Sequence, residues 1–320
     1  MKEVLFEQTG KPLEVLKLQD APVPNPGEGE VLIRVTARNI NPADMMFIQG
    51  LYGIQPQFPS SAGFEACGVL ESSGSKLSKG TRVLFSTTGT WREYLALPEA
   101  SLIPIPDGMP DEVATQAIVN PMTAYLMIEK SGLKADEWLL ITAGASAFGK
   151  FAIQLAKKKG IKVACTVRHD EQKEILKKLG ADLVVNTEKE KLQKVVPEHT
   201  DGGVHVVFDA VGGLLGAKAL ASLRKNGLMM VFGSLSLENI PLNSGLMIFK
   251  TLRIEGFWLT SLMSEIKSEA RNKAFQEVFE FLMNHSSQVD VAEKYPLEEF
   301  EEAIKAYEKA GRNGKILLIS

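Results

Sequence analysis

The segment "LITAGASAFGKFAIQLA" (residues 140–156) decides the fold of this 320-residue chain. An apolar run ends there in a turn of small residues, and a pattern with the period of an amphipathic helix begins directly afterwards. Small residues in such a turn let a pyrophosphate approach the backbone, and the free N–H groups that begin a helix favour an anion. Gly144 and Gly149 stand among Ala and Ser without a full G-x-G-x-x-G, so a plain strand-to-helix turn of an unrelated α/β sheet is the alternative.

The chain around this turn alternates between short apolar runs and longer helical patterns. Such alternation predicts an α/β domain with a doubly wound parallel sheet of the Rossmann type, covered by helices on both faces. The expected strands are 137–142, 161–167, 182–186, 205–211 and 228–233, and the expected helices are 148–160, 170–181 and 214–227.

The two ends of the chain have a different pattern. Short strand candidates separated by Gly and Pro fill the first hundred residues and predict a compact β-rich, antiparallel or barrel-like unit. The last sixty residues predict two helices, 272–285 and 297–311, and a terminal strand, 314–320. We expect them to return to that unit, because they cannot bury a core of their own. The predicted domains are 1–118 with 262–320, and 119–261.

Composition excludes several classes of protein. The chain is 45% hydrophobic and 23% charged, and its net charge of −3 gives no basic surplus to indicate nucleic acid. No run of 18 apolar residues is present to cross a membrane, and the start lacks a signal-peptide pattern. Cys67 and Cys165 cannot build a disulfide framework, which predicts a cytoplasmic protein.

The end of the second predicted strand indicates the cofactor. Sites for NAD usually place an acid there, whereas this chain has Arg168, 19 residues beyond Gly149. A guanidinium suits a 2′-phosphate, and Lys173 would add a second positive group. Asp170 is either the ribose acid displaced by two positions or, as we expect, the cap of the next helix. The pattern therefore predicts NADPH over NADH.

Five further motifs accompany the cofactor turn: "NINPADMMFIQGLYG" (39–53), "GTWREYLALPEASLIPIP" (89–106), "VNPMTAYLMI" (119–128), "VRHD" (167–170) and "GFWL" (256–259). Together these motifs resemble the medium-chain dehydrogenase/reductase superfamily over essentially the whole chain. The likeness is closest to the zinc-free 2-enoyl thioester reductases of the mitochondrial type, with the quinone oxidoreductases next. It implies a GroES-like catalytic domain beside the Rossmann domain, and a homodimer.

Four positions depart from the pattern of relatives. Zinc-dependent members would have Cys near Asp44 and His at Phe64, and Glu65 remains alone, so we expect Glu65 to form structural hydrogen bonds. Relatives often carry Gly-Val where this chain has Ala147 and Phe148, which leaves the fit of the larger ring open.

The chain also lacks cysteines for a zinc site of four thiolates, and its histidines show no metal-ligand spacing, so we expect no metal. These histidines are His169, His199, His205 and His285.

The resemblance also implies a set of cofactor contacts. Asn41, Asn120 and Thr123 match positions that hold the nicotinamide and its ribose, although lone polar residues are often caps or turns. Trp258 is a candidate wall of the acyl pocket or a core residue, and Lys315 is a cofactor contact or a surface residue. The other predicted cofactor contacts are Gly144, Ala145, Ser146, Ala147, Phe148, Arg168, Lys173, Phe232, Gly233, Phe257 and Trp258.

The candidate catalytic residue is Tyr52, in the loop "IQGLYGIQPQFP" (residues 48–59). Reducing a conjugated C=C requires a hydride at the β-carbon and a proton at the α-carbon. A phenol is protonated at neutral pH, and on a loop between glycines its ring can reach over an interdomain cleft. We therefore expect Tyr52 to donate the proton and to line the substrate pocket. The alternative is a tyrosine that packs the loop onto the body of the domain.

Three functions follow from this reading. The first is NADPH-dependent reduction of 2-enoyl thioesters of CoA or of an acyl-carrier protein. The second is NADPH:quinone or enone oxidoreduction on the same scaffold, which needs no dedicated acid. The third belongs to another class: a nucleotide-binding partner protein without turnover, supported only by the departure from glycine in the cofactor turn.

Overall fold

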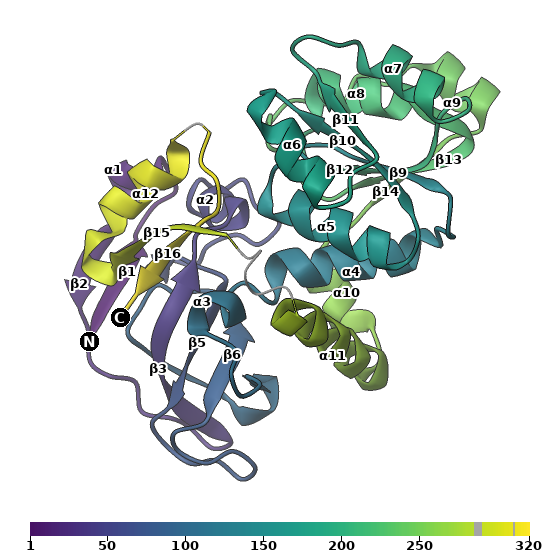
Figure 1. The fold of residues 1–320 in the computed structure, drawn as a ribbon. Coiled ribbons are helices and arrows are strands. Elements are labelled where there is room, and N and C mark those ends of the chain that lie inside the picture. Colours follow the sequence, from purple (N-terminus) through teal and green to yellow (C-terminus); the bar gives the residue numbers. More distant parts are fainter. Residues whose placement is uncertain (285–289, 310) are drawn as a thin grey trace. The chain divides into compact units, whose positions relative to one another are not determined.

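The chain forms two compact units in a computed structural model that describes residues 1–284, 290–309 and 311–320 (Figure 1). Unit 1 comprises Met1–Val119 with Phe279–Ser320, and unit 2 comprises Asn120–Val278. Each is described by itself below. Within the described residues, no helix is both long enough and apolar enough to cross a membrane.

Unit 2 is built on a six-stranded sheet in which all neighbouring strands run parallel. The strand order is β11-β10-β9-β12-β13-β14, so the chain reverses its direction of travel between β9 and β12. This is the doubly wound arrangement predicted from the strand–helix alternation. The strands are β9 (Trp138–Ile141), β10 (Lys162–Val167), β11 (Leu183–Asn186), β12 (Val204–Asp209), β13 (Leu223–Val231) and β14 (Arg253–Gly256).

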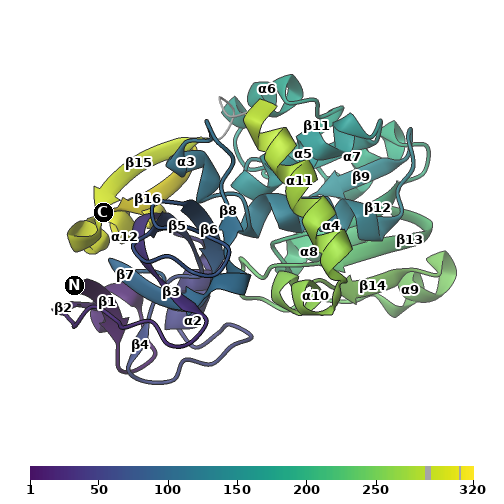
Figure 2. The ribbon, with the colours of Figure 1, turned by 90° about the horizontal axis from the view of Figure 1, so that it is seen from below.

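Helices cover both faces of this sheet (Figures 1 and 2). Leu192 and Val196 of α7, with Ala219 and Leu220 of α8, pack on one face in a core that includes buried strand residues such as Met229. Helices α4, α5 and α6 lie on the other face (Figure 2). The helices are α4 (Val119–Ser131), α5 (Ala147–Lys158), α6 (Glu171–Lys178), α7 (Leu192–His199), α8 (Gly213–Ala221), α9 (Ser244–Lys250), α10 (Leu259–Glu265) and α11 (Ser268–Asn284).

Strand β13 begins earlier than expected. The sequence pattern predicts a helix over 214–227, but α8 ends at Ala221 and the strand starts at Leu223. Leu223 is fully buried and pairs with Val204 of β12, which draws it into the sheet. Asn226 has a φ of 64°, a left-handed conformation that cannot continue a helix.

The return of the chain to unit 1 comes at Phe279 and not at residue 262 as expected. Helix α11 begins in unit 2, where Ala274 and Val278 are buried. Glu277 also forms an ion pair with Lys158 of α5, with 3.6 Å between the carboxylate and the ammonium. These contacts attach most of α11 to unit 2, and the final residue of the helix predicted over 272–285 lies outside the described residues.

Unit 1 contains a seven-stranded sheet and a small three-stranded sheet. The large sheet has the order β15-β16-β3-β5-β6-β8, with β7 paired to β3, and the small one has the order β2-β1-β4. The terminal strand β16 pairs antiparallel with β3, as the expected return requires. The strands are β1 (Lys2–Phe6), β2 (Lys17–Asp20), β3 (Glu30–Asn39), β4 (Ser60–Ser61), β5 (Glu65–Leu70), β6 (Arg82–Ser86), β7 (Tyr94–Pro98), β8 (Ile103–Pro104), β15 (Val291–Pro296) and β16 (Lys315–Ile319).

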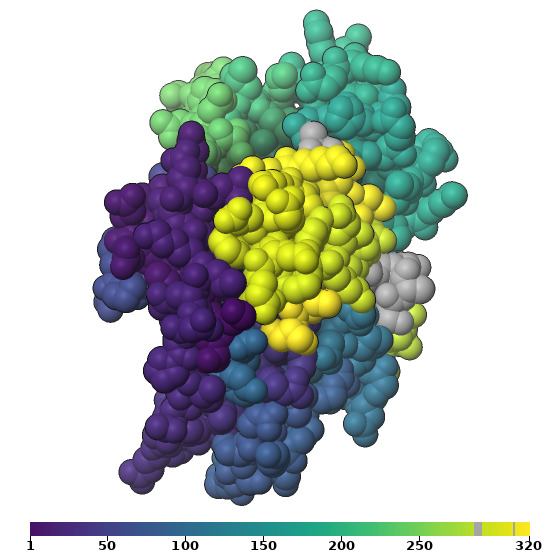
Figure 3. All heavy atoms as spheres, turned by 90° about the vertical axis from the view of Figure 1, so that its left-hand side faces the viewer, coloured from purple at the N-terminus to yellow at the C-terminus, as the bar shows by residue number. Residues whose placement is uncertain are grey.

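The core of unit 1 joins the two ends of the chain. Phe6, Phe47, Trp91 and Phe300 are buried together, and strand β16 contributes Ile316. In Figure 3 the N-terminal segment and the C-terminal helix lie side by side on the surface above this core. The helical segments are α1 (Pro12–Val15), α2 (Pro42–Ile48), η1 (Glu99–Ser101), α3 (Asp111–Ala114), η3 (Leu297–Glu299) and α12 (Phe300–Glu308).

A buried guanidinium links β3 to the C-terminus. Arg38 is fully buried, and its Nε and Nη2 atoms donate to the carbonyl oxygens of Thr90 and Arg92 at 3.2 and 2.8 Å. Its Nη1 donates to Leu318 O at 3.3 Å, and Nη2 also donates to the Ser320 hydroxyl at 2.8 Å. Burial lowers the pKa of Arg38 to about 10. One cation on β3 therefore satisfies acceptors from two separate segments, at residues 90–92 and 318–320.

Arg38→Met should lower the free energy of unfolding by on the order of 3 kcal/mol, because it leaves buried carbonyl oxygens without donors. The matched control is Arg34→Met on the same strand. Arg34 forms a partly exposed ion pair with Glu71 at 3.0 Å, and its loss should cost about 1 kcal/mol or less. Equal losses in urea unfolding of the two variants would contradict the role given to Arg38.

Candidate functional site

The turn between β9 and α5 holds the first helical turn against the end of the strand. A Cβ placed on Gly149 would lie 2.4 Å from the carbonyl oxygen of Gly144, so no larger residue fits there. A Cβ on Gly144 would lie 2.7 Å from the Cβ of Cys165 in β10. Ser146 is the N-cap, and its hydroxyl accepts the Gly149 N–H at 3.0 Å. The free N–H groups that begin α5 therefore stand at the carboxyl edge of the sheet, and the N-terminus of a helix generally favours an anion.

The departures from glycine in this turn are accommodated. Ala143 takes a left-handed conformation with a φ of 52°, and its N–H donates to the Thr166 hydroxyl at 3.1 Å. Phe148 is buried, and its ring stacks on Phe232 with 4.0 Å between centroids. Phe208 approaches the same ring edge-on at 6.4 Å. The open question about the fit of Phe148 is resolved, and the one argument for a binding protein without turnover loses its basis.

A hydrogen-bonded pair that the sequence reasoning missed orders the neighbouring strand end. The Thr142 hydroxyl donates to Oδ1 of Asp209 at 2.7 Å and accepts the Ala210 N–H at 2.9 Å. Oδ2 of Asp209 accepts the Gly212 N–H at 3.0 Å. Both side chains are fully buried, so they fix the two strand ends on either side of the point where strand order reverses. The acid at the end of "HVVFDAV" was the available signal.

The end of β10 carries an unpaired cation. Arg168 directly follows the strand and is exposed, and within the described part of the chain its guanidinium has no hydrogen-bond or ion-pair partner. Asp170 is the N-cap residue of α6, as expected, but its side chain makes no capping bond. Asp170 instead accepts from Asn186 Nδ2 at 2.8 Å and from Lys189 Nζ at 2.5 Å. These partners hold the pKa of Asp170 at about 2.

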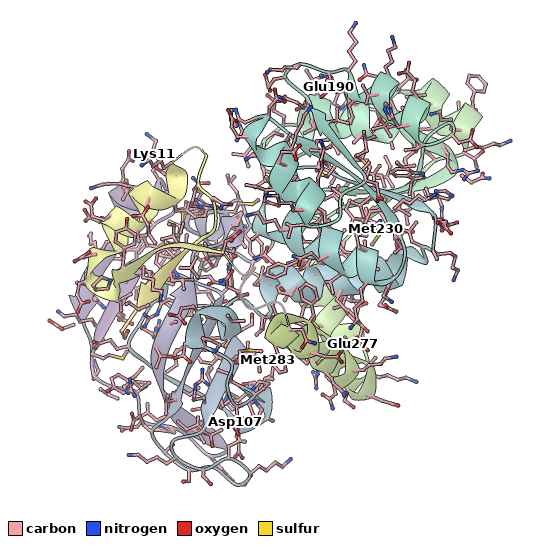
Figure 4. The ribbon with its side chains drawn as sticks, in the orientation of Figure 1. Lys11, Asp107, Glu190, Met230, Glu277 and Met283 are labelled. Carbon is pink, nitrogen blue, oxygen red and sulfur yellow. The ribbon has the colours of Figure 1, made fainter. Side chains whose placement is uncertain are left out.

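Lys173, the second predicted positive group, is already paired. Its ammonium lies 2.7 Å from Glu190, which is labelled in Figure 4, and 3.5 Å from Asp170. Glu190 also accepts the Asn186 N–H at 2.9 Å. Lysines and an amide thus engage both acids of this edge, Asp170 and Glu190, whereas Arg168 has no hydrogen-bond or ion-pair partner within the described residues.

The other predicted contacts of unit 2 lie on α4 and at the carboxyl edge of the sheet. Asn120 and Thr123 are both in the first turns of α4; Thr123 is buried, and the buried Nδ2 of Asn120 has no partner among the described residues. Gly233 follows β13, and a Cβ there would lie 2.8 Å from the Ala210 carbonyl oxygen. Phe257 is buried beyond β14, whereas Trp258 is 41% exposed, which excludes the core alternative for that tryptophan. Met230, labelled in Figure 4, lies buried in β13 beneath this edge.

Tyr52 lies in unit 1, in the loop that follows α2. Its ring is half-buried against the aromatic core and lies 5.0 Å from the Phe64 ring, tilted by 43°. Gly50 precedes it with a φ of 73°, a conformation that favours glycine. Packing on Phe64 therefore sets the direction of the phenol. The ring thus packs the loop onto the body of the domain, as the alternative interpretation predicted. This packing does not exclude a role for the hydroxyl.

A set of buried polar side chains occupies the neighbouring part of unit 1. Lys315 is 5% exposed, so the surface alternative is wrong, and its ammonium donates to Oδ1 of Asn41. Glu65 accepts from Asn39 Nδ2 and, at 2.6 Å, from the Val119 N–H, which are the hydrogen bonds expected of it. The fifth member is Asp44, whose Oδ2 accepts the Asn41 N–H at 2.6 Å.

Burial dominates the electrostatics of this set. It raises the pKa of Asp44 to about 7 and that of Glu65 to about 8, and the nearby Lys315 partly offsets both rises. Burial also lowers the pKa of Lys315, against the attraction of Glu65 and Asp44. Among the described residues, no group of three or more His, Cys, Asp or Glu is arranged to hold a metal. The acids at these positions face an ammonium.

Glu65→Gln should change how stability depends on pH. The folded-state pKa of Glu65 lies above its ordinary value of 4.5, so the wild type loses stability as pH rises from about 5 to 8, by up to about 1.4 kcal/mol per pH unit. The variant lacks the part of this loss that comes from residue 65, because glutamine does not titrate. Urea unfolding at several pH values should therefore show the wild type losing stability relative to the variant. Parallel curves would mean that Glu65 stays ionised beside Lys315 throughout.

Comparison with known proteins places this architecture in a family. Residues 27–107 match the model of the alcohol dehydrogenase GroES-like domain, and residues 147–283 match that of zinc-binding dehydrogenases. The mitochondrial enoyl-(acyl-carrier-protein) reductase of Arabidopsis thaliana is 32% identical over 98% of this chain and 87% of its own length. Prostaglandin reductase-3 of Mus musculus is 32% identical over 68% of this chain and 59% of its own length.

Solved structures give the same result. The Escherichia coli quinone oxidoreductase in complex with NADPH superposes with a TM-score of 0.91 at 29% identity, and the match covers the whole of both chains. This chain has Asp44 and Phe64 near and at the places where the resemblance leads us to expect the Cys and His ligands of zinc-dependent members. The chain therefore belongs to the zinc-free branch of the medium-chain dehydrogenase/reductase superfamily of oxidoreductases.

Proposed function

We propose that this protein is an NADPH-dependent 2-enoyl thioester reductase. The observation that carries the proposal is Tyr52, a loop phenol whose ring is held by Phe64 and the core. An enoyl reductase needs such a proton donor, and a quinone reductase does not. The likeness over almost the whole chain to enoyl-(acyl-carrier-protein) reductases supports the same choice.

The residues of unit 2 fit the proposed cofactor. The turn from Gly144 to Phe148 and the start of α5 would receive the pyrophosphate, because a Cβ at Gly149 has no room and the helix begins with free N–H groups. Arg168 would bind the 2′-phosphate. Asp170 is engaged by Lys189 and Asn186, which disfavours it as a ligand for a ribose diol. The backbone at Phe232 and Gly233 would line the cofactor.

The chemistry divides between cofactor and protein. When bound, NADPH supplies the hydride that the β-carbon of the enoyl thioester accepts. The electron pair of the C=C bond then resides on the enolate of the thioester. Tyr52 donates its phenolic proton to the α-carbon, and solvent returns a proton to the phenolate. Trp258, partly exposed beyond β14, would form one wall of the acyl pocket.

The second candidate is NADPH:quinone or enone oxidoreduction. It is favoured by the match of the whole chain to the Escherichia coli quinone oxidoreductase. The two functions share the cofactor site and differ in the need for an acid. Substrate comparison in a Tyr52 variant therefore separates them.

We further propose a homodimer and a cytoplasmic location. Strand β14 is the edge of the described sheet, bonded to β13 alone, and two such edges can join across a twofold axis. Cys67 and Cys165 are buried free thiols, as expected in a reducing compartment. The acyl carrier would be CoA or an acyl-carrier protein.

Tyr52→Phe should lower kcat for crotonyl-CoA about 100-fold or more, because the variant keeps the ring packing and loses the proton. The KM for NADPH and the rate with a quinone acceptor should stay near those of the wild type. Steady-state NADPH oxidation with both acceptors measures these effects. Tyr94→Phe, a phenol on β7, is the matched control. Unchanged crotonyl-CoA reduction in Tyr52→Phe would remove the catalytic role of the phenol.

Arg168→Ala should raise the KM for NADPH about 10- to 100-fold and leave the KM for NADH unchanged, because a charge-assisted hydrogen bond is worth about 1.5–3 kcal/mol. Arg271→Ala, at an exposed position of α11, is the control. The measurement is the ratio of kcat/KM for the two cofactors. A similar change for NADH would show that Arg168 does not discriminate between them.

A further inference from the structure

The side chain of Lys315 is placed by the pairing of the last strand with β3. Leu317 pairs with Asn39, and the Ile40 N–H donates to the Ile316 carbonyl at 3.1 Å. This register sets Lys315, the first residue of β16, beside Asn41, the residue before α2. Its ammonium donates to Oδ1 of Asn41, and both side chains are at least 95% buried.

The Lys315 ammonium sets the orientation of the Asn41 side-chain amide. An ammonium has donors and no acceptor, so only the carbonyl oxygen of the amide can face it. The Nδ2 group of Asn41 is therefore turned to another side. It is buried, and among the described residues it has no hydrogen-bond partner. A buried donor without a partner in a side chain that is 1% exposed indicates an acceptor supplied by a ligand.

The charge of Lys315 is balanced within unit 1. Glu65 and Asp44 attract the buried ammonium, and Arg312 opposes it. Both carboxylates have further donors: the Val119 N–H for Glu65 and the Asn41 N–H for Asp44. The cation is therefore fixed by its surroundings. The Asn41 amide is also polarised, because its oxygen accepts a hydrogen bond from a cation. This polarisation makes its N–H groups stronger donors.

We propose that Lys315 is a positioning residue that acts on NADPH through Asn41, without touching the cofactor itself. It holds the Asn41 amide so that Nδ2 is presented to a neutral oxygen of the nicotinamide nucleoside, a ribose hydroxyl or the carboxamide oxygen. This inference rests on the proposed NADPH-dependent function and replaces the direct cofactor contact expected for Lys315. A carbonyl oxygen of the acyl substrate has the same acceptor chemistry, so the test separates the two sources.

The test compares Lys315→Met, Asn41→Ala and the double variant Lys315→Met/Asn41→Ala. The dissociation constant of NADPH is measured by fluorescence titration without substrate, and the KM of crotonyl-CoA is measured separately. Each single variant should weaken NADPH binding about tenfold, and the double variant should bind no more weakly than Asn41→Ala. The KM of crotonyl-CoA should change little. Lys294→Met, which removes a partly exposed ion pair with Glu112, is the control and should bind NADPH as the wild type does.

A further variant separates positioning from stability, because Lys315→Met leaves two buried acids without their cation. Lys315→Met/Glu65→Gln reduces that imbalance and should unfold at a higher urea concentration than Lys315→Met, while its weakened NADPH binding persists. Recovery of NADPH binding in this variant would overturn the proposal, as would additive losses in the Asn41 double variant. A raised KM for crotonyl-CoA with unchanged NADPH affinity would assign the acceptor to the substrate and would also overturn it. A wild-type protein that fails to bind NADPH would instead refute the proposed function.

Discussion

The close contact between the turn after β9 and the first turn of α5 is the constraint on which the nucleotide-binding unit depends. The carbonyl of Gly144 lies where a Cβ of residue 149 would be, so the helix rests on the turn without an intervening side chain. Ser146 caps the helix, and the ring of Phe148 packs against that of Phe232. The helix N-terminus is thereby fixed at the edge where β9 and β12 end. Arg168 and the turn after β13 belong to the same edge.

Unit 1 depends on a different constraint, the burial of two cations on adjacent strands. Arg38 of β3 is satisfied by carbonyl oxygens and a hydroxyl, whereas Lys315 of β16 faces an amide oxygen and two carboxyl groups. Buried charges are stable only with fixed partners, so each cation orders the segments around it.

Patterns that are local in sequence predicted most of the fold. The strand–helix alternation predicted the parallel sheet, and the segment at 140–156 predicted the turn of small residues between β9 and α5. Two local errors have physical causes. The buried Leu223 pairs with Val204 of β12, so the chain enters the sheet where a helix was expected, and contacts with α5 hold the start of α11 in unit 2. The position of Arg168 directly after β10 was also predictable, because it depends on the end of one strand.

Features that depend on distant partners could not be predicted in this way. The partners of Asp170 lie in the next strand and turn, at Asn186 and Lys189, so a capping role was the simplest local reading. Lys315 and Asn41 are 274 residues apart, and only the pairing of β16 with β3 brings them together. The hydrogen bond between Thr142 and Asp209 also forms only because β9 and β12 are adjacent in the sheet. Tyr52 was found through its loop, but its ring packing required Phe64.

The proposed function combines two roles: the carboxyl edge of the unit 2 sheet binds NADPH through its 2′-phosphate, and Tyr52 protonates the enolate. The most direct measurement is mass spectrometry of the product formed from crotonyl-CoA and NADPH in D₂O by the wild-type protein. The account predicts butyryl-CoA with one solvent deuteron at the α-carbon and the cofactor-derived hydrogen at the β-carbon. Consumption of NADPH with quinones alone, and no butyryl-CoA, would contradict it.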